Sequence, residues 1–442
     1  MSASRRIAIT GTGAVCGAGV GVDAIWDAVV NGRSAIKEIS SWDASRWPTR
    51  LGAEVTGVDN RALVEDRKLH KLVTRTDLFG LYAAGAAIQR SGITGHRETL
   101  TAEALSRFND RSGVFVGSGG GNYRSNYEFF PLLTAANGDF EKFGRELGEN
   151  VNPMWLLRIL PNNVVCHVGI RHNFKGTNGC IINQCVGGAM AVAEAAAAVR
   201  AGEADRAVAV GHDTPLEPET VLHYGHLNLM SPDGLRPFDR ERRGTVFGEG
   251  AAAVLLETMA DAQARQAVIL GEFLGSGCAT EATGILDVRP DGDGLRRAIE
   301  IALGEAGVSP DGIGVIVAHA NGTPASDASE AQALRRLFGN HLPPVTGFKW
   351  AFGHLIAGSG ALDLIMALCA LRQGIVPGIP TLDSLDPEFG AFPASRAAQR
   401  PRSDTALVLC RGFGGMNVAL VVRANAACAG ESATSSRTGG LK

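Results

Sequence analysis

The sequence lacks the features that mark secreted, metal-binding, membrane-spanning or nucleic-acid-binding proteins. Its eight cysteines are scattered singly with no CxxC pair, so neither a disulfide framework nor a zinc site is indicated. No stretch of about 18 apolar residues occurs, so no membrane span is predicted. The formal net charge is only −3, which provides no basic surface for nucleic acid.

The amino end also lacks a targeting segment. Residues 1–6 run directly into the apolar, strand-like stretch 7–10, without the apolar region of a signal peptide. Together with the unpaired cysteines, this indicates a protein of the reducing cytoplasm. Glycine is abundant at 57 residues and follows no collagen-like period, which is typical of an α/β enzyme with many tight turns.

At 442 residues the chain exceeds what one hydrophobic core usually serves, so two domains or two fused halves are expected. Short apolar runs alternate with amphipathic or alanine-rich stretches, which predicts α/β layers around mixed or parallel sheets. The predicted strands include residues 6–10, 113–117, 207–210 and 315–318, and the predicted helices include 24–31 and 328–337.

An internal sequence repeat, called the internal echo below, supports two related halves. Residues 185–189 lead an alanine-rich helix that ends near Gly202, and residues 354–361 lead a similar helix that ends near Gly374. Each is followed by a glycine-rich stretch and a strand-like run. If the halves are related, both helix N-termini point toward a shared centre. Chance similarity between two Gly/Ala-rich helices is the alternative.

Three segments depart from this alternation. Residues 234–244 are charged and rich in turn formers, which predicts a loop before a strand. Residues 122–158 form an insertion that is expected to cap a pocket, to make a subunit contact or simply to pack as a helical excursion. The tail after Arg423 has too little apolar surface to fold and is expected to be mobile.

Cys185 stands where a predicted loop becomes the first long, small-residue helix. Unpaired N–H groups and the positive dipole end of a helix favour a thiolate over a free thiol of pKa ~8.5, so the position suggests a nucleophile. The alternative is an ordinary buried cysteine, because cysteine is among the most buried residue types.

Two histidines downstream provide partners for that thiol. His319 ends the apolar run 315–318, where α/β sheets place their ligands, and His354 stands at a second strand-to-helix turn, five residues after Lys349. A satisfied core histidine is the alternative for each. Together, a thiolate can accept an acyl group while two imidazoles stabilise charge on one carbonyl oxygen.

With these residues in place, the sequence resembles the β-ketoacyl synthase family, the condensing enzymes of fatty-acid and polyketide assembly, over about residues 5–423. Any one of five ordered motifs is weak, but their joint order and spacing is very specific. The motifs are Arg6-Ile7-Ala8-Ile9-Thr10-Gly11; the Cys185 elbow; Arg236-Pro237-Phe238-Asp239 with Gly248-Glu249-Gly250; His319 with Gly322-Thr323-Pro324, Asp327 and Glu330; and Lys349 with Gly353-His354 and Gly412-Phe413-Gly414-Gly415-x-Asn417.

The resemblance implies an α/β, thiolase-like fold with two related halves in a layered αβαβα core. It implies a ping-pong reaction in which Cys185 accepts an acyl chain from an acyl carrier protein. His319 and His354 then promote decarboxylation of a malonyl-carrier thioester, and the carbanion attacks the acyl-enzyme to give a 3-oxoacyl product. No metal or dissociable cofactor is required, because the phosphopantetheine arrives on the carrier protein.

The resemblance also assigns supporting roles. The backbone N–H groups of Cys185 and Phe413 are expected to form the oxyanion hole, and Phe413 to gate the pocket. Lys349 with Glu330 is expected to orient the site. Asn321 and Thr323, in the run that follows the first histidine, are the expected phosphopantetheine contacts.

Departures from the family pattern occur close to the site. Gln184 precedes the nucleophile where the family usually has alanine or glycine, Asn321 replaces a threonine, and Met416 replaces the threonine of a Gly-Thr-Asn ending. An amide still donates a hydrogen bond, so carrier binding is expected to be altered rather than lost. These changes favour a specialised pathway over housekeeping fatty-acid elongation.

Three other functions fit the sequence less well. A chain-length-factor-like partner subunit usually lacks the nucleophile, whereas this chain retains Cys185 and both histidines. A degradative thiolase would show a second cysteine in the final glycine-rich motif, and an initiating synthase would carry asparagine in place of His354. We therefore expect a discrete elongating synthase that forms a homodimer, or a heterodimer with a related subunit.

The expected division of the chain follows the same resemblance. Residues 1–257 form the amino-terminal half with the nucleophile elbow and an insertion at about 118–160. Residues 258–423 form the carboxy-terminal half with both histidines, and residues 424–442 form the tail.

Overall fold

The structure is a computed structural model that describes residues 5–120 and 129–425. Its strands are β1 (Ile7–Cys16), β2 (Gly19–Val20), β3 (Lys37–Glu38), β4 (Leu51–Gly52), β5 (Ser112–Ser118), β6 (Asn178–Ile182), β7 (Arg206–Asp213), β8 (Gly250–Thr258), β9 (Gly271–Thr280), β10 (Val315–Val317), β11 (Val345–Thr346), β12 (Thr405–Gly412) and β13 (Met416–Ala424). The predicted strands at 6–10, 113–117, 207–210 and 315–318 all fall on or across these. Short apolar runs bounded by turn residues therefore identified buried strands correctly.

The helices are α1 (Val22–Val30), α2 (Asn60–Leu63), α3 (Arg75–Arg90), α4 (Ile93–Glu98), α5 (Ala102–Asp110), α6 (Phe130–Ala136), α7 (Phe140–Asn150), α8 (Trp155–Ile159), α9 (Asn163–His172), α10 (Gly187–Ala201), α11 (Pro218–His226), α12 (Met259–Ala264), α13 (Asp293–Ala306), α14 (Pro324–Phe338), α15 (Lys349–Phe352) and α16 (Ser359–Gln373). Both small-residue helices of the internal echo, α10 and α16, end at a glycine in the left-handed region, as expected.

The main sheet shows that the two halves are related. Its strand order is β11-β10-β12-β13-β9-β1-β8-β7-β5-β6, so each half contributes five strands in the same succession from the edge inward. The halves join where β1 pairs antiparallel with β9, with Ile7 opposite Phe273 and Ile9 opposite Gly271. The internal echo therefore reflects a repeated fold unit and not chance similarity.

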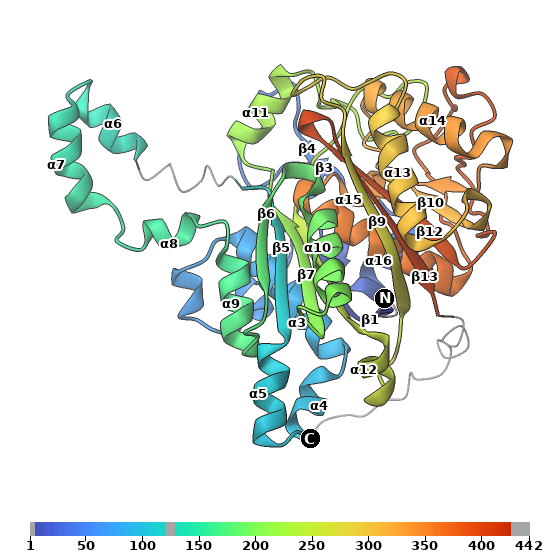
Figure 1. Cartoon of the computed structure of the whole chain (residues 1–442). Coiled ribbons are helices and arrows are strands. Elements are labelled where there is room, and N and C mark those ends of the chain that lie inside the picture. Colours follow the sequence, from blue (N-terminus) through green and yellow to red (C-terminus); the bar gives the residue numbers. More distant parts are fainter. Residues whose placement is uncertain (1–4, 121–128, 426–442) are drawn as a thin grey trace, which may run out of the picture.

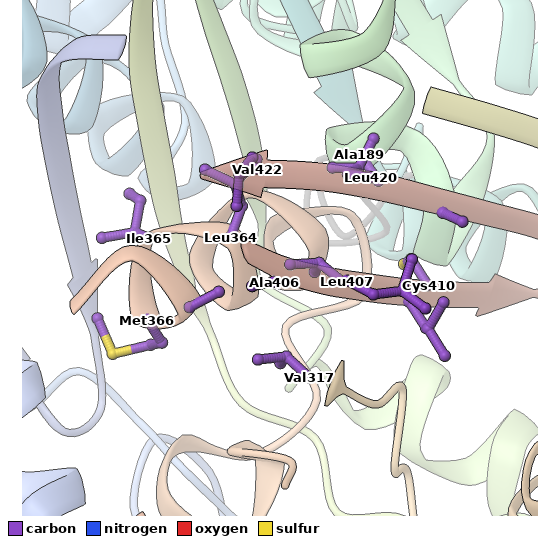
Figure 2. Close-up of a cluster of buried hydrophobic side chains, with 14 of the residues drawn as sticks. Ala189, Val317, Leu364, Ile365, Met366, Ala406, Leu407, Cys410, Leu420 and Val422 are labelled. Carbon is purple, nitrogen blue, oxygen red and sulfur yellow. The ribbon is translucent and has the colours of Figure 1, made fainter. Parts of the chain in front are cut away.

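Helices fill the space between and outside the two halves of this sheet (Figure 1). The central pair, α10 and α16, packs against strands of both halves and against each other, while α3 and α9 cover one half and α13, with α14 beside it, covers the other. This is the αβαβα layering expected from the resemblance. Figure 2 shows the apolar packing of the central layer, where Leu364 of α16 lies with Leu407 of β12 and Val422 of β13.

The central helix α16 and the turn before it form an apolar stretch of membrane-spanning length, although the sequence predicted no span. Residues Ile356–Gln373 are long and apolar enough to cross a bilayer, but 83% of this stretch is buried inside the fold. Its apolar character therefore reflects burial between two sheet halves.

The structure describes the charged loop fully and the insertion in part. Residues 234–244 form a loop before β8, as predicted. The insertion contains the helices α6, α7 and α8, which extend away from the body of the molecule (Figure 1). Residues 121–128 of the insertion and residues 426–442 of the tail lie outside the described residues.

Candidate active site

Cys185 lies in a 3-10 turn, η3 (Gln184–Val186), that runs directly into α10. Gln184 has φ +43°, in the left-handed region that glycine favours, so the turn before the thiol is strained. Close packing holds it, because a Cβ on Gly188 would lie 2.2 Å from the carbonyl oxygen of Ala357. Cys185 is 6% exposed. The sequence therefore placed the cysteine correctly, at a loop-to-helix junction.

The two histidines reach the same place from the other half. His319 follows β10, and His354 follows the short helix α15. Their ring centroids lie 5.2 Å apart at an interplanar angle of 81°. Cys185, His319 and His354 all line one cavity, together with Asn321, Thr323 and Phe413. Six of the eight site residues predicted from the sequence thus meet in one cavity.

The hydrogen bonds of the imidazoles define which ring nitrogen carries the proton. The backbone N–H of Arg411 donates to Nδ1 of His319 at 3.3 Å, and the backbone N–H of Ile356 donates to Nδ1 of His354 at 3.2 Å. Because each Nδ1 accepts a hydrogen bond, the proton of the neutral ring sits on Nε2. Each ring therefore has an Nε2–H group that can donate a hydrogen bond to a substrate.

Both imidazoles are neutral at physiological pH. Burial, followed by the charge of Lys349, holds the pKa of His319 and of His354 well below the ordinary value of 6.5. A neutral Nε2–H donor can bind a developing oxyanion without losing its proton.

The ionisation state of Cys185 differs from the sequence-based expectation of a thiolate. Burial raises the pKa of the Cys185 thiol to about 12, the carboxylate of Asp213 acts in the same direction, and Lys349 opposes them. The expectation counted the helix terminus but not the loss of water around the sulfur, which disfavours the charged form. Cys185 is therefore a neutral thiol that lines the same cavity as two neutral imidazoles.

Lys349 and Glu330 lie behind the cavity and have separate partners. The Glu330 carboxylate accepts hydrogen bonds from the backbone N–H groups of His319 at 2.7 Å and of Ala320 at 2.9 Å. These bonds fix the loop that carries the His319 imidazole. Lys349 donates from Nζ to Oδ2 of Asp363 at 2.8 Å, and both side chains are fully buried. Asp363, on α16, was not identified from the sequence.

Breaking this buried ion pair is expected to destabilise the fold strongly. Lys349→Met leaves the Asp363 carboxylate buried without a counter-charge, and Oδ1 of Asp363 already has no partner among the described residues. We expect a loss of about 3–5 kcal/mol of unfolding free energy, measured by urea denaturation. The double variant Lys349→Met/Asp363→Leu should recover most of this loss. A double variant as unstable as the single one would contradict the assignment.

The carrier-facing side of the cavity has its own internal bonds. Thr323 donates to Oδ1 of Asn321 from its backbone N–H at 3.0 Å and from its hydroxyl at 2.9 Å. This turn uses the amide oxygen of Asn321 and leaves its NH₂ group to donate. The predicted role of the two residues as phosphopantetheine contacts is compatible with this arrangement.

Phe413 is half-buried at the cavity wall. It begins the turn Phe413–Gly415, in which Gly414 has φ +72° and Gly415 has φ +69°, and its ring centroid lies 5.3 Å from that of Tyr224. A Cβ on Gly412 would lie 3.5 Å from Cβ of Cys185, so the strand end before Phe413 passes close to Cys185. The roles of Phe413 as gate and oxyanion-hole donor stay predictions.

A second cysteine lies next to Cys185. Cys410 donates from Sγ to the carbonyl oxygen of Cys185 at 3.1 Å, and it is 1% exposed within the core cluster (Figure 2). Burial raises its pKa strongly. It belongs to the packed interior and not to the described cavity lining, so it does not act as the second active-site cysteine of a thiolase.

Comparison with known proteins identifies relatives over nearly the whole chain. Residues 4–262 match the family model described as beta-ketoacyl synthase, N-terminal domain, and residues 270–383 match the corresponding C-terminal domain. A 3-oxoacyl-[acyl-carrier-protein] synthase 2 from Coxiella burnetii is 31% identical over 432 residues, which are 95% of this chain and 98% of the relative.

Solved structures agree with this match. A crystal structure of a beta-ketoacyl synthase from Burkholderia phymatum has a TM-score of 0.84 at 26% identity and covers 95% of this chain and 100% of its own. The ishigamide ketosynthase/chain length factor has a TM-score of 0.82 at 25% identity, covering 96% of this chain and 100% of its own.

Proposed function

Because this chain belongs to the β-ketoacyl synthase family, we propose that it condenses an acyl group, held as a thioester on Cys185, with a malonyl-acyl carrier protein to give a 3-oxoacyl-acyl carrier protein. The observation that carries this proposal is the meeting of one cysteine and two neutral imidazoles in one cavity. The enzyme is thus an acyltransferase that forms a C–C bond.

The reaction begins with acyl transfer from the carrier to the enzyme. The sulfur of Cys185 attacks the carrier thioester, its proton passes to the departing phosphopantetheine thiol, and the acyl-enzyme thioester forms. Because burial raises the thiol pKa to about 12, the proton leaves the sulfur in the same step in which the departing thiol takes it up, and no free thiolate accumulates beforehand. The predicted oxyanion hole of Cys185 and Phe413 backbone N–H groups would stabilise this step.

Condensation follows when malonyl-carrier enters. The two Nε2–H donors bind the thioester oxygen of the malonyl group, carbon dioxide leaves, and the electron pair stays on the enolate that they stabilise. Its carbon attacks the acyl-enzyme carbonyl, and the bond to Cys185 breaks as the 3-oxoacyl-carrier forms. The Cys185 thiolate then regains a proton from solvent. These steps need no metal and no resident cofactor, since phosphopantetheine arrives with the substrate.

Gln184, Asn321 and Met416 support a specialised pathway. All three lie at or beside the nucleophile and the cavity, where they change the shape and hydrogen bonding offered to the acyl chain and its carrier. A housekeeping substrate would not require such changes.

The alternative function is a chain-length-factor-like partner with little activity of its own. The relative named as a ketosynthase/chain length factor makes this class worth testing. Retention of Cys185, His319 and His354 at one cavity favours an active synthase, because a non-condensing subunit has no use for them.

Self-association is supported by the edge of the sheet. The strand β6 is unpaired on one side within the described chain, and its Ile182 is 53% exposed. Phe140 on the projecting insertion is 79% exposed. An exposed edge strand with neighbouring apolar side chains suits pairing with a second subunit. A cytoplasmic dimer that works with a carrier protein fits these features.

The function is tested by mixing the purified protein with an acyl-carrier protein and a malonyl-carrier protein. We expect release of carbon dioxide and a 3-oxoacyl-carrier product, identified by intact mass. Decarboxylation and condensation that appear only after a second synthase subunit is added would instead support the partner-subunit function.

Phe413 offers a test of acyl selection. Phe413→Ala is expected to change the chain-length preference of loading with a stability loss of about 1 kcal/mol, because the ring is half-buried and lines the cavity. A core phenylalanine would instead cost about 3–5 kcal/mol. Competition loading with acyl-carriers of different length, together with thermal denaturation, distinguishes the two. A collapsed melting temperature with unchanged acyl preference would disprove gating.

A further inference from the structure

The turn that follows His354 is strained at an unusual residue. Ile356 has φ +46°, and a β-branched side chain in the left-handed region is a genuine outlier. Such strain persists only when surrounding structure imposes it, and it clusters at functional sites. The turn, η6 (Ile356–Gly358), stands before α16 in the same place that η3 occupies before α10.

This strained turn controls the orientation of His354. The backbone N–H of Ile356 donates to Nδ1 of His354 at 3.2 Å, and the Ser359 hydroxyl lies 2.9 Å from the same nitrogen. If Ile356 relaxed to an ordinary backbone conformation, its N–H would turn away from the ring. The Nε2–H of His354 would then lose its fixed direction toward the cavity.

Asp213 anchors the middle of this turn from the opposite half of the molecule. It is the last residue of β7, which packs against η6, and its carboxylate accepts a hydrogen bond from the backbone N–H of Thr214 at 2.8 Å. The backbone N–H of Ala357, in η6, also interacts with this carboxylate. Its Oδ2 also occupies the space over Gly119, where a Cβ would lie only 1.9 Å away. The carboxylate is therefore closely packed at the end of β7, beside the residue after Ile356.

The same carboxylate acts on the nucleophile. The turns η3 and η6 pack against each other, and the charge of Asp213 raises the pKa of the Cys185 thiol. Charged groups that influence this pair are Glu217, which raises the pKa of Asp213, and Lys349, which lowers that of Cys185. Burial brings the pKa of Asp213 itself to about 7.

We propose that Asp213 is a positioning residue for the condensation, which holds the Ile356–Ala357 turn by a hydrogen bond and thereby aims His354. This inference rests on the proposed function. The acceptor oxygen of Asp213 sets the geometry of His354, whereas the charge of Asp213 sets how readily Cys185 ionises. Variants that remove only the charge, or both the charge and the oxygen, therefore distinguish the two effects.

The test compares Asp213→Asn and Asp213→Ala in two half-reactions. Asparagine keeps an acceptor oxygen for Ala357 and removes the charge, while alanine removes both. We expect malonyl-carrier decarboxylation to stay within about threefold of wild type in Asp213→Asn and to fall at least about tenfold in Asp213→Ala. Asp205→Asn, a carboxylate just before the opposite end of β7, serves as control and should not change either half-reaction.

The pH profile of acyl loading provides a readout that a purely structural role would not move. Removing the negative charge lowers the pKa of Cys185, so the rise of the loading rate in Asp213→Asn should shift to lower pH by about half a unit or more. Asp213→Ala should show the same shift, because it loses the same charge.

Several results would overturn the proposal. Equal decarboxylation in wild type and a folded Asp213→Ala would remove the positioning role. A tenfold loss of decarboxylation in Asp213→Asn would also remove the positioning role, because asparagine keeps the acceptor oxygen. If Asp213→Ala does not fold, the Asp213→Asn result alone tests the proposal. Wild-type protein that neither loads nor decarboxylates would overturn the proposed function and this inference together, whereas an active wild type with unaffected variants would overturn this inference alone.

Discussion

Cys185→Ala is expected to abolish acyl loading and to lower condensation at least about a thousandfold, because the acyl group then has no covalent attachment point. The fold should remain, since the substitution removes one sulfur atom. The hydrogen bond from Cys410 reaches the backbone carbonyl of Cys185, which alanine keeps. We expect a stability loss of about 1 kcal/mol at most.

The matched control for this variant is Cys16→Ala. Cys16 is also buried, and burial likewise raises its pKa to about 12, but it ends β1 away from the cavity lining. The Cys16→Ala variant should load the acyl group and catalyse condensation as wild type does. Thioester-linked acyl mass on Cys185→Ala would show that another residue is the nucleophile.

The second large effect concerns the histidines. His319→Ala and His354→Ala are each expected to lower malonyl-carrier decarboxylation about 100- to 1,000-fold, the usual cost of removing one donor from an oxyanion site. Acyl loading should fall less, because its oxyanion is expected at backbone N–H groups and Lys349 still favours ionisation of Cys185. Single-turnover assays of the two half-reactions measure the difference.

His172→Gln is the control for the histidine variants. Burial lowers the pKa of His172 to about 4, so it is also a neutral imidazole, but it lies at the end of α9, outside the cavity lining. Its half-reactions should match those of wild type. Equal losses of loading and decarboxylation in the His319 and His354 variants would refute the division of roles.

The positions of the candidate catalytic residues could be predicted because local signals mark them. His319 ends an apolar run, and Cys185 and His354 precede helices whose glycines and alanines permit close packing. Parallel strands and related halves bring such positions together. The meeting of six predicted residues in one cavity follows from that repeated architecture.

What escaped prediction depends on contacts between distant segments. The neutral state of Cys185 reflects burial by residues from both halves, which no local pattern records. Asp363 is the single carboxylate in the mostly apolar helix α16, which signals a buried pair, but its partner Lys349 lies on a separate short helix before it. In the sequence, Asp213 is one of many polar residues at a strand end, and its proximity to Ala357 is visible only in the folded chain.

The central claim, that Cys185 carries the acyl group during catalysis, is tested most directly by locating that group. Wild-type protein is loaded from an acyl-carrier protein, digested with trypsin and fragmented in a mass spectrometer. Cleavage after Lys175 and Arg200 gives residues 176–200, which contain both Cys180 and Cys185, so fragment ions must separate the two. We predict the acyl mass on Cys185, and its loss when malonyl-carrier is added. An acyl group on Cys180 or any other residue, or one that malonyl-carrier does not discharge, would contradict this account.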